Sequence, residues 1–232
     1  RYIDIWTSIT HQIYLYTIAK EIKNFTDMLI QSTFDFKTLN ELNQSEMRLG
    51  GLRINPVTNI SSSVNYINNV KLRKVSDSVE QQVKGLPKDA LISNLMWSPN
   101  EKKIAFTHTT SNAVELWVID VASAQAKRLS NAKLNANLDN PFVWFKDSEN
   151  LLVKVLPKNR PALLDASKDL PTGAIISNAD GSVSQNRTYP DLLKNRNDEI
   201  NFENIASSEL HKVHVSGTST LWKKADMYAG ES

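Results

Sequence analysis

The sequence predicts an all-β fold, and three observations support this. From about residue 60 onward, short strand-like runs alternate with turn residues. A pattern of tryptophan, polar turn and apolar strand occurs twice, and the run 113–121 is apolar on both of its faces. The chain has 232 residues, 41% hydrophobic and 22% charged, which suits one large all-β domain or two ordinary domains.

The N-terminal segment 1–26 shares none of this pattern. Its stretch RYIDIWTSITHQIYLYTIAKEIKNF is rich in apolar residues but carries Asp4, Lys20 and Glu21, which make it too polar for a clean membrane span. It also lacks the layout of a signal peptide. A helical structure is one alternative for this unmatched segment. The chain as a whole resembles an internal piece of a longer protein.

The strand-like runs come next in the chain. The last four of them are joined by only a few residues each, which predicts an antiparallel meander. Their turns contain Ser98-Pro99-Asn100 and Ser111-Asn112, residue types that are typical of tight turns. The six runs are 69–76, 79–87, 90–98, 102–109, 113–121 and 124–130.

Two sequence words recur at related distances. WSPNEKKIAF begins at Trp97, and WFKDSENLLV begins at Trp144, 47 residues later (144 − 97). ELWVIDV at 115–121 is echoed by ELHKVHV at 209–215, a gap of 94 (209 − 115). The segment 157–200 lacks strand alternation and is rich in Pro, Asn, Asp and Ser. It therefore predicts a long loop insertion of 44 residues (200 − 157 + 1), without which the second spacing falls to 50.

A four-stranded unit of about 40 to 50 residues is the size of one β-propeller blade. A β-sandwich is the alternative, and the recurrence of both words favours blades. A strand that is apolar on both faces needs cover on both, as stacked blades would provide. The sequence thus predicts a partial β-propeller of about two to three four-stranded antiparallel blades. The expected domains are the unmatched segment 1–26 and the propeller 27–232, with blades at about 27–87, 90–130 and 140–225.

Several longer stretches of the sequence are similar to segments of one known family. They occur in the same order along the chain as in that family. They are LNELNQSEMRLGGLRINPVTN at 39–59, the stretch 85–138 that contains WSPNEKKIAF, NPFVWFKDSENLLVKVLPKNR at 140–160 and RTYPDLLKNRNDEINFENIASSELHKVHVSG at 187–217. Together they resemble the propeller of the glutamyl-endopeptidase-like branch of the prolyl oligopeptidase family. The similarity covers roughly residues 27 to 225.

The resemblance implies a two-domain serine peptidase that cleaves peptides rather than folded proteins. An N-terminal propeller would shield the active site, and a C-terminal α/β-hydrolase domain would carry the Ser-Asp-His triad. The expected partners of this chain are then a peptide substrate and that α/β-hydrolase domain, and the expected location is periplasmic or secreted. Two features depart from the family: segment 1–26 lacks the expected Ser-Pro-Asp-Gly turn, and the sequence stops at Ser232 before any hydrolase domain.

No catalytic residue can be assigned in the chain. The nearest approach to a Gly-x-Ser-x-Gly nucleophile elbow is Gly217-Thr218-Ser219-Thr220-Leu221, which ends in Leu and lies in a strand-like stretch. We reject it for these reasons. The chain has no cysteine, which excludes disulfides, thiolate nucleophiles and Cys-based zinc sites.

No cofactor or metal site is expected either. His211 and His214 are spaced i, i+3, so on a strand they point to opposite faces and do not share a metal. His11 and His108 have no acidic or histidine cluster nearby in the sequence. We therefore expect the close pair to be one packed and one solvated histidine.

Other notable side chains have structural explanations that we favour. An acidic group after the insertion could bind an ammonium group, but a solvated loop with ordinary charges explains it better: Asp198, Glu199 and Glu203. The tryptophans at repeated strand positions indicate blade core: Trp97, Trp117 and Trp144. The basic run without a glycine-rich loop indicates a solvated strand face: Lys71, Arg73 and Lys74. The Asn-x-Ser/Thr matches are expected by chance in an Asn-rich chain: Asn24, Asn43, Asn59 and Asn186.

Two functions from different classes follow. The first is the propeller part of a serine oligopeptidase, which gates the active site, selects substrates by size and breaks no bond itself. The second is a non-catalytic propeller module of the bacterial envelope that binds another protein. With 27 basic and 25 acidic side chains and a net charge of +2, the chain has no electrostatic footprint for nucleic acid.

Overall fold

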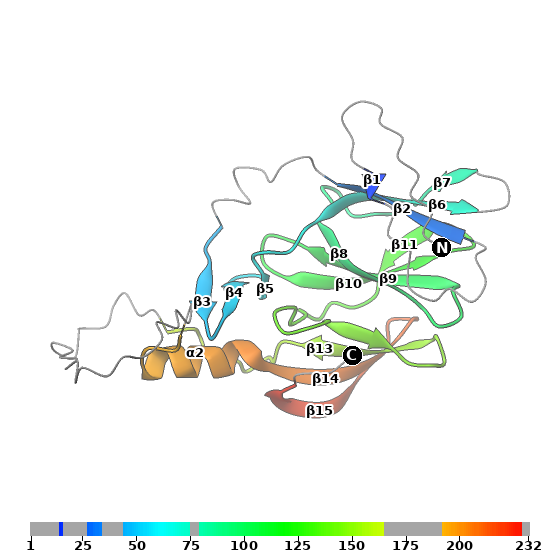
Figure 1. Cartoon of the computed structure of the whole chain (residues 1–232). Helices are drawn as coiled ribbons and strands as arrows, with labels where there is room; N and C mark the ends of the chain where they lie inside the picture. The colour runs from blue at the N-terminus through cyan, green and yellow to red at the C-terminus, as the bar shows by residue number, and fades with distance from the viewer. Residues whose placement is uncertain (1–13, 16–26, 34–43, 75–78, 165–191, 229–232) are drawn as a thin grey trace, which may run out of the picture.

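The computed structural model describes residues 14–15, 27–33, 44–74, 79–164 and 192–228 (Figure 1). In the described ranges nearly all of the regular secondary structure is β, with one helix. The strands are β1 (Tyr14–Leu15), β2 (Asp27–Thr33), β3 (Met47–Leu49), β4 (Leu52–Asn55), β5 (Ile60–Ser61), β6 (Ile67–Lys74), β7 (Glu80–Gln82), β8 (Ile92–Trp97), β9 (Lys103–Thr109), β10 (Val114–Asp120), β11 (Gln125–Arg128), β12 (Phe142–Trp144), β13 (Asn150–Val155), β14 (Ser207–His214) and β15 (Ser219–Met227). The helix is α2 (Arg196–Ala206).

The strands form three antiparallel units of four strands each. The orders are β1-β2-β6-β7, then β8-β9-β10-β11, then β12-β13-β14-β15. A single pair, Ile67 with Ile92, links the first unit to the second. Strands β3, β4 and β5 form a separate small sheet beside α2 (Figure 1). The predicted fold class, all-β with two to three four-stranded antiparallel blades, is confirmed.

Two apolar cores lie between the units and stack them. The first core contains residues of β6, β8, β9 and β10, so it joins the first unit to the second: Val70, Leu72, Ile92, Ile104, Phe106 and Ile119 among others. The second core contains residues of β9, β10, β13 and β14, so it joins the second unit to the third: Ala105, Leu116, Val118, Leu151, Val153 and Val213 among others.

Strand β10 is covered on both faces, as its apolar sequence predicts. Leu116 and Val118 point into the core shared with the third unit. Ile119 points into the core shared with the first unit, and Trp117 packs against the same core. A central strand of stacked sheets is buried from both sides because each sheet covers its neighbour.

The two tryptophan–turn–strand words form the same turn. Glu101 and Ser148 are 47 residues apart (148 − 101), and their φ angles are 60° and 61°. The Glu101 N–H donates to the Ser98 carbonyl at 2.8 Å, and the Ser148 N–H donates to the Phe145 carbonyl at 3.0 Å. Trp97 packs against the first core and Trp144 against the second, so each tryptophan holds the same place one unit apart.

The second repeated word has matching strand register. Asp120 pairs with Lys103 in the second unit, and His214 pairs with Asn150 in the third. The third strands are thus offset by 94 residues (214 − 120), whereas the second strands are offset by 47 (150 − 103). The difference arises in the connection between them, which is 110–113 in the second unit and 156–206 in the third.

Contacts between successive units follow the same repeat. The Asn100 N–H in the turn of the second unit donates to the Ser148 hydroxyl in the turn of the third at 3.0 Å. The Trp144 indole N–H donates to the Met96 carbonyl at 3.1 Å. In each contact the residue of the third unit lies one position beyond the equivalent of its partner in the second unit, 48 residues along the chain (148 − 100 and 144 − 96).

Two expectations about elements need correction. In segment 1–26 the structure describes only Tyr14–Leu15, which are a strand paired with β2, so a helix is wrong for these two residues. The predicted loop 157–200 is helical from Arg196, and the helix continues to Ala206. It begins there because the Asn195 side chain accepts from the Asp198 N–H at 2.9 Å and caps the N-terminus.

Candidate functional site

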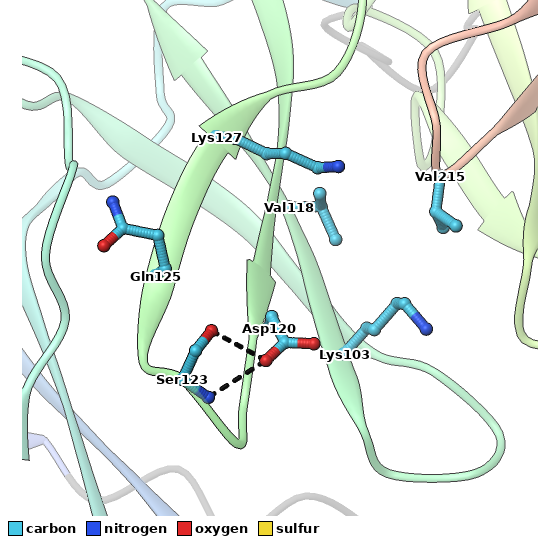
Figure 2. Close-up of a pocket in the computed structure, with 7 residues that line it drawn as sticks. All are labelled: Lys103, Val118, Asp120, Ser123, Gln125, Lys127 and Val215. Carbon is cyan, nitrogen blue, oxygen red and sulfur yellow. Dashed lines mark hydrogen bonds between the residues drawn. The ribbon is translucent and has the colours of Figure 1, made fainter.

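A groove lies between the second and third units (Figure 2). Its volume is about 240 Å³. Val118 and Lys127 line it from the second unit, and Val215, next to the β14–β15 turn, lines it from the third (Figure 2). Most of the surface of its wall is apolar.

The charged groups of this groove have structural partners. The Ser123 hydroxyl and N–H donate to Asp120 at 2.8 and 2.9 Å, and these hydrogen bonds lower the pKa of the Asp120 carboxyl (Figure 2). Lys103 forms an ion pair with Glu149 of the third unit at 3.0 Å. Asp120 therefore stabilises the β10–β11 turn, and Lys103 helps to join two units, so neither is arranged for acid–base chemistry.

In the structure, Ser219 of the rejected motif Gly217–Leu221 lies beside a histidine and a carboxylate. The Ser219 hydroxyl lies 3.1 Å from His211 Nδ1, and His211 Nε2 lies 3.0 Å from Glu209 Oε2. Sequence reasoning missed this Ser-His-Glu chain, although the i, i+2 spacing of Glu209 and His211 on a strand places both on one face.

The contact between the carboxylate and the ring recurs in the second unit. In the second unit, 94 residues earlier (209 − 115), Glu115 accepts from the Trp117 indole N–H at 3.0 Å. Glu209 and His211 make the same contact with an imidazole in place of the indole. Ser219 sits in a regular antiparallel ladder opposite Val213, without the sharp strand-to-helix turn of a nucleophile elbow.

The other histidines do not form a site. His214 contacts the Ser216 hydroxyl at 2.8 Å in the β14–β15 turn. His108 is buried, accepts from the Leu91 N–H at 3.3 Å, and burial lowers its pKa. Within the described residues, no group of three His, Asp or Glu side chains could hold a metal ion. His11 lies outside the described residues.

The acidic group after the insertion lies on α2 rather than in a loop. Asp198 accepts from the Lys194 N–H at 2.8 Å, and Glu199 pairs with Arg196 at 2.6 Å. Both are in the first helical turn, where carboxylates favour the positive end of the helix dipole. Together with the exposed Glu203, they form a solvated helix face.

The basic and aromatic candidates also have structural roles. Lys71 pairs with Glu80 across β6 and β7 at 3.2 Å. Trp117 stacks on Phe106 with ring centroids 6.1 Å apart. Of the Asn-x-Ser/Thr matches, Asn59 is fully buried, and the other three lie outside the described residues.

Asn59 is part of a buried polar network that nothing in the sequence indicates. Arg160 Nη1 donates to Asn59 Oδ1 at 2.6 Å, and Asn59 Nδ2 donates to Asn135 Oδ1 at 2.7 Å. Asn135 Nδ2 in turn donates to the Ile205 carbonyl at the end of α2 at 2.8 Å. Asn137 Nδ2 donates to the same carbonyl at 2.9 Å. The network connects the start of the insertion, its terminal helix and the linker between the second and third units.

Comparison with known proteins gives sequence relatives of one kind. The chain is 32% identical over 194 residues to the probable chloroplastic glutamyl endopeptidase of Oryza sativa subsp. japonica and 31% identical over 194 residues to that of Arabidopsis thaliana. Each match covers 78% of this chain and 20% of the relative. The chain is homologous to the glutamyl endopeptidases. This confirms its resemblance to that branch of the prolyl oligopeptidase family, and the chain spans about a fifth of the length of these relatives.

Solved structures show weaker likeness. The acylaminoacyl peptidase of Pyrococcus horikoshii matches 84% of this chain and 24% of its own, with 16% identity and a TM-score of 0.39. A prolyl endopeptidase matches 86% of this chain and 23% of its own, with 15% identity and a TM-score of 0.38. These scores are too low to equate the folds, so the homology rests on the glutamyl endopeptidases.

No protein-family model matches the sequence. None of the helical residues that the structure describes belongs to a helix long and apolar enough to cross a membrane. The periplasmic or secreted location stays a prediction from the resemblance.

Proposed function

We propose that this chain is the propeller part of a serine oligopeptidase. In this role it gates access to an active site and selects peptide substrates by size, while a separate α/β-hydrolase domain of the same enzyme breaks the bond. The observation that carries the proposal is homology to the glutamyl endopeptidases. The match has 32% identity over 194 residues and covers about a fifth of the length of the relative.

The geometry of the described residues supports a structural role in gating. Stacked four-stranded units form a rigid wall because each interface is an apolar core. Among the described residues, Ser219, His211 and Glu209 form a serine-histidine-carboxylate chain whose carboxylate contact recurs with tryptophan in the second unit, which favours a structural role for it. A wall of this kind can exclude folded proteins sterically while short peptides pass.

The test uses the purified chain and the complete gene product. The chain alone should not hydrolyse fluorogenic glutamyl peptides, whereas the complete product should hydrolyse short peptides and leave folded proteins intact. Removing residues 1–232 from the complete product should relax the limit on substrate size.

Two results would overturn the proposal. One is any hydrolysis by the purified chain, whether the Ser219→Ala variant retains it or loses it. The other is a gene that encodes further blades and then stops without a Gly-x-Ser-x-Gly elbow and later Asp and His codons, which would favour the non-catalytic binding module.

A further inference from the structure

The connections between the second and third strands differ in length among the three units. The second unit joins β9 to β10 with only residues 110–113, whereas the first unit uses 34–66 and the third uses 156–206. The described parts of the two long connections pack together, since the small sheet β3–β5 comes from the first and α2 comes from the third (Figure 1). They therefore join two units that are not neighbours in the stack.

The two long connections share a small apolar core of their own. Leu49 and Ile54 of the small sheet are buried together with Ile205 of α2. Gly50, in the β3–β4 turn with φ at 57°, lies against the ring of Phe202, and a Cβ atom added at Gly50 would lie 2.9 Å from that ring. The sheet and the helix are therefore in close contact at a position that only glycine fits.

Buried polar groups from three segments attach this pair of connections to the stack. Asn59 Nδ2 of the first connection donates at 2.7 Å to Asn135 Oδ1, in the linker between the second and third units. Asn135 Nδ2 donates at 2.8 Å to the Ile205 carbonyl of the third unit's connection, which also accepts from Asn137 at 2.9 Å. All of these residues are buried, so the loss of one partner leaves a polar group without water to replace it.

The connection of the first unit also reaches the core between the second and third units. Ile60 is buried in that core with Leu134 and Ala136, and it pairs with Ala136 in a parallel bridge. The Ala136 N–H donates to the Asn59 carbonyl at 3.0 Å. In a stack of repeats each unit contacts only its neighbours. A segment that belongs to the first unit and packs on the interface between the other two is thus an additional restraint.

We propose that the two long connections form a strap that clamps the first three units together, fastened where Asn59, Asn135 and Ile205 meet. The strap consists of the described residues 44–66 and 192–206. Its own core contains three buried residues, so it opens more readily than the large cores between units, and it opens as one piece. If the proposed peptidase function holds, the closed strap keeps long peptides from entering between these units.

Thiol labelling measures the opening directly, because the 232-residue chain has no cysteine of its own. Ala136→Cys places a thiol beneath the first connection, and Ala206→Cys places one at the end of α2, since both alanines are buried. Ala105→Cys, on β9 in the core between the second and third units, reports unfolding of the stack itself. Relative to their rates in urea, the two strap thiols should be protected equally, and Ala105→Cys should be protected more strongly.

Asn59→Gly loosens the strap at its fastening. Glycine keeps the left-handed backbone of Asn59 and removes its side chain, so labelling of both strap thiols should rise about tenfold or more while Ala105→Cys keeps its rate. The matched control is Asn94→Gly. Asn94 has a φ of 52° and donates to Thr107 at 2.9 Å, but it lies outside the strap, so its removal should leave the strap thiols within about twofold.

Gly50→Ala loosens the strap at its other contact. The added Cβ displaces Phe202, so both strap thiols should again label faster if the strap opens as one piece. Gly51→Ala is the control, because Gly51 has a φ of 83° and nothing lies within 4 Å of an added Cβ. The difference between the two variants separates the contact with Phe202 from the strain of a left-handed alanine.

Three labelling results would each overturn the strap. One is faster labelling at only one of the two strap thiols in Asn59→Gly or Gly50→Ala. Another is an equal change in Asn59→Gly and Asn94→Gly. The third is labelling of Ala105→Cys that rises as much as that of the strap thiols, which would mean that the stack unfolds as a whole.

The consequence for substrates is tested in the complete gene product. Asn59→Gly should raise the cleavage of long peptides relative to short ones, whose kcat/KM should stay the same, and Asn94→Gly should alter neither. An unchanged ratio would overturn the role of the strap in substrate selection. A gene product without a hydrolase domain would refute the peptidase function instead, and the labelling results would stand independently of it.

Discussion

Replacing Leu151 by alanine tests whether the second and third units share one core. Leu151 is fully buried on β13, in the cluster that also contains Leu116 of β10. Burial of the lost methyl and methylene groups is worth about 0.8 kcal/mol each. The cavity left behind raises the total cost for a leucine in such a core to about 3–4 kcal/mol.

The assay is urea unfolding followed by both tryptophan fluorescence and far-UV circular dichroism. With a slope of about 1–3 kcal/mol per molar urea, the midpoint should fall by about 1 M or more. Leu221→Ala is the control, because Leu221 lies on β15 and is 53% exposed. That change should cost no more than about 0.5 kcal/mol.

The reasoning also predicts that both probes report one transition. Trp97 and Trp117 pack against the first core, Trp144 packs against the second, and Trp222 lies on β15, so tryptophan fluorescence follows all three units. If the stack is cooperative, Leu151→Ala lowers their transition together with the overall loss of strand signal. A cost below about 1 kcal/mol, or a tryptophan transition that stays at the original midpoint, would refute a core shared between units.

Three further predictions follow. Asn135→Ala should destabilise the chain by about 2–4 kcal/mol in urea unfolding, because it removes the acceptor of the buried Asn59 amide and the donor to the Ser208 hydroxyl, while the Ile205 carbonyl keeps its hydrogen bond from Asn137. Stability should fall as the pH is lowered below about 6.5, since burial lowers the pKa of His108 and the unfolded chain then binds the proton more readily; His108→Gln should flatten this slope. Trp222→Ser should raise the protein concentration at which the chain self-associates in analytical ultracentrifugation, because Trp222 is 52% exposed on the outer strand of the third unit.

Each of these has a result that contradicts it. Asn135→Ala with an unchanged midpoint would mean that the polar network does not hold α2. A pH slope that survives in His108→Gln would assign the titration to another group. Identical association curves for Trp222→Ser and the parent chain would show that another surface drives self-association.

The repeated units were predictable because their signals are local. A tryptophan, a polar turn and an apolar strand lie within ten residues of one another, and the turn at Glu101 forms from its own neighbours. The same local pattern at Ser148 gives the same turn. Strand alternation likewise predicts β8 to β11, since each of these strands pairs with its sequence neighbour.

The helix and the polar network were not predictable because long-range contacts create them. Helix α2 has few apolar residues, and its C-terminal carbonyl at Ile205 is satisfied by Asn135, 70 residues earlier. Arg160 and Asn59 are 101 residues apart, so no spacing in the sequence joins them. Asn59 stood out only as part of an Asn-x-Ser match, which its complete burial makes irrelevant.

The contacts between units give the stack a polarity. The Met96 carbonyl of one unit receives the indole N–H of Trp144 in the next, so the two sides of a unit present different chemistry. Two identical sides cannot form this head-to-tail interface with each other across a two-fold axis. Units joined in this way either add further units or close into a ring. The Val143 carbonyl, 47 positions after Met96, is consequently where an indole or similar donor from a following sheet would attach.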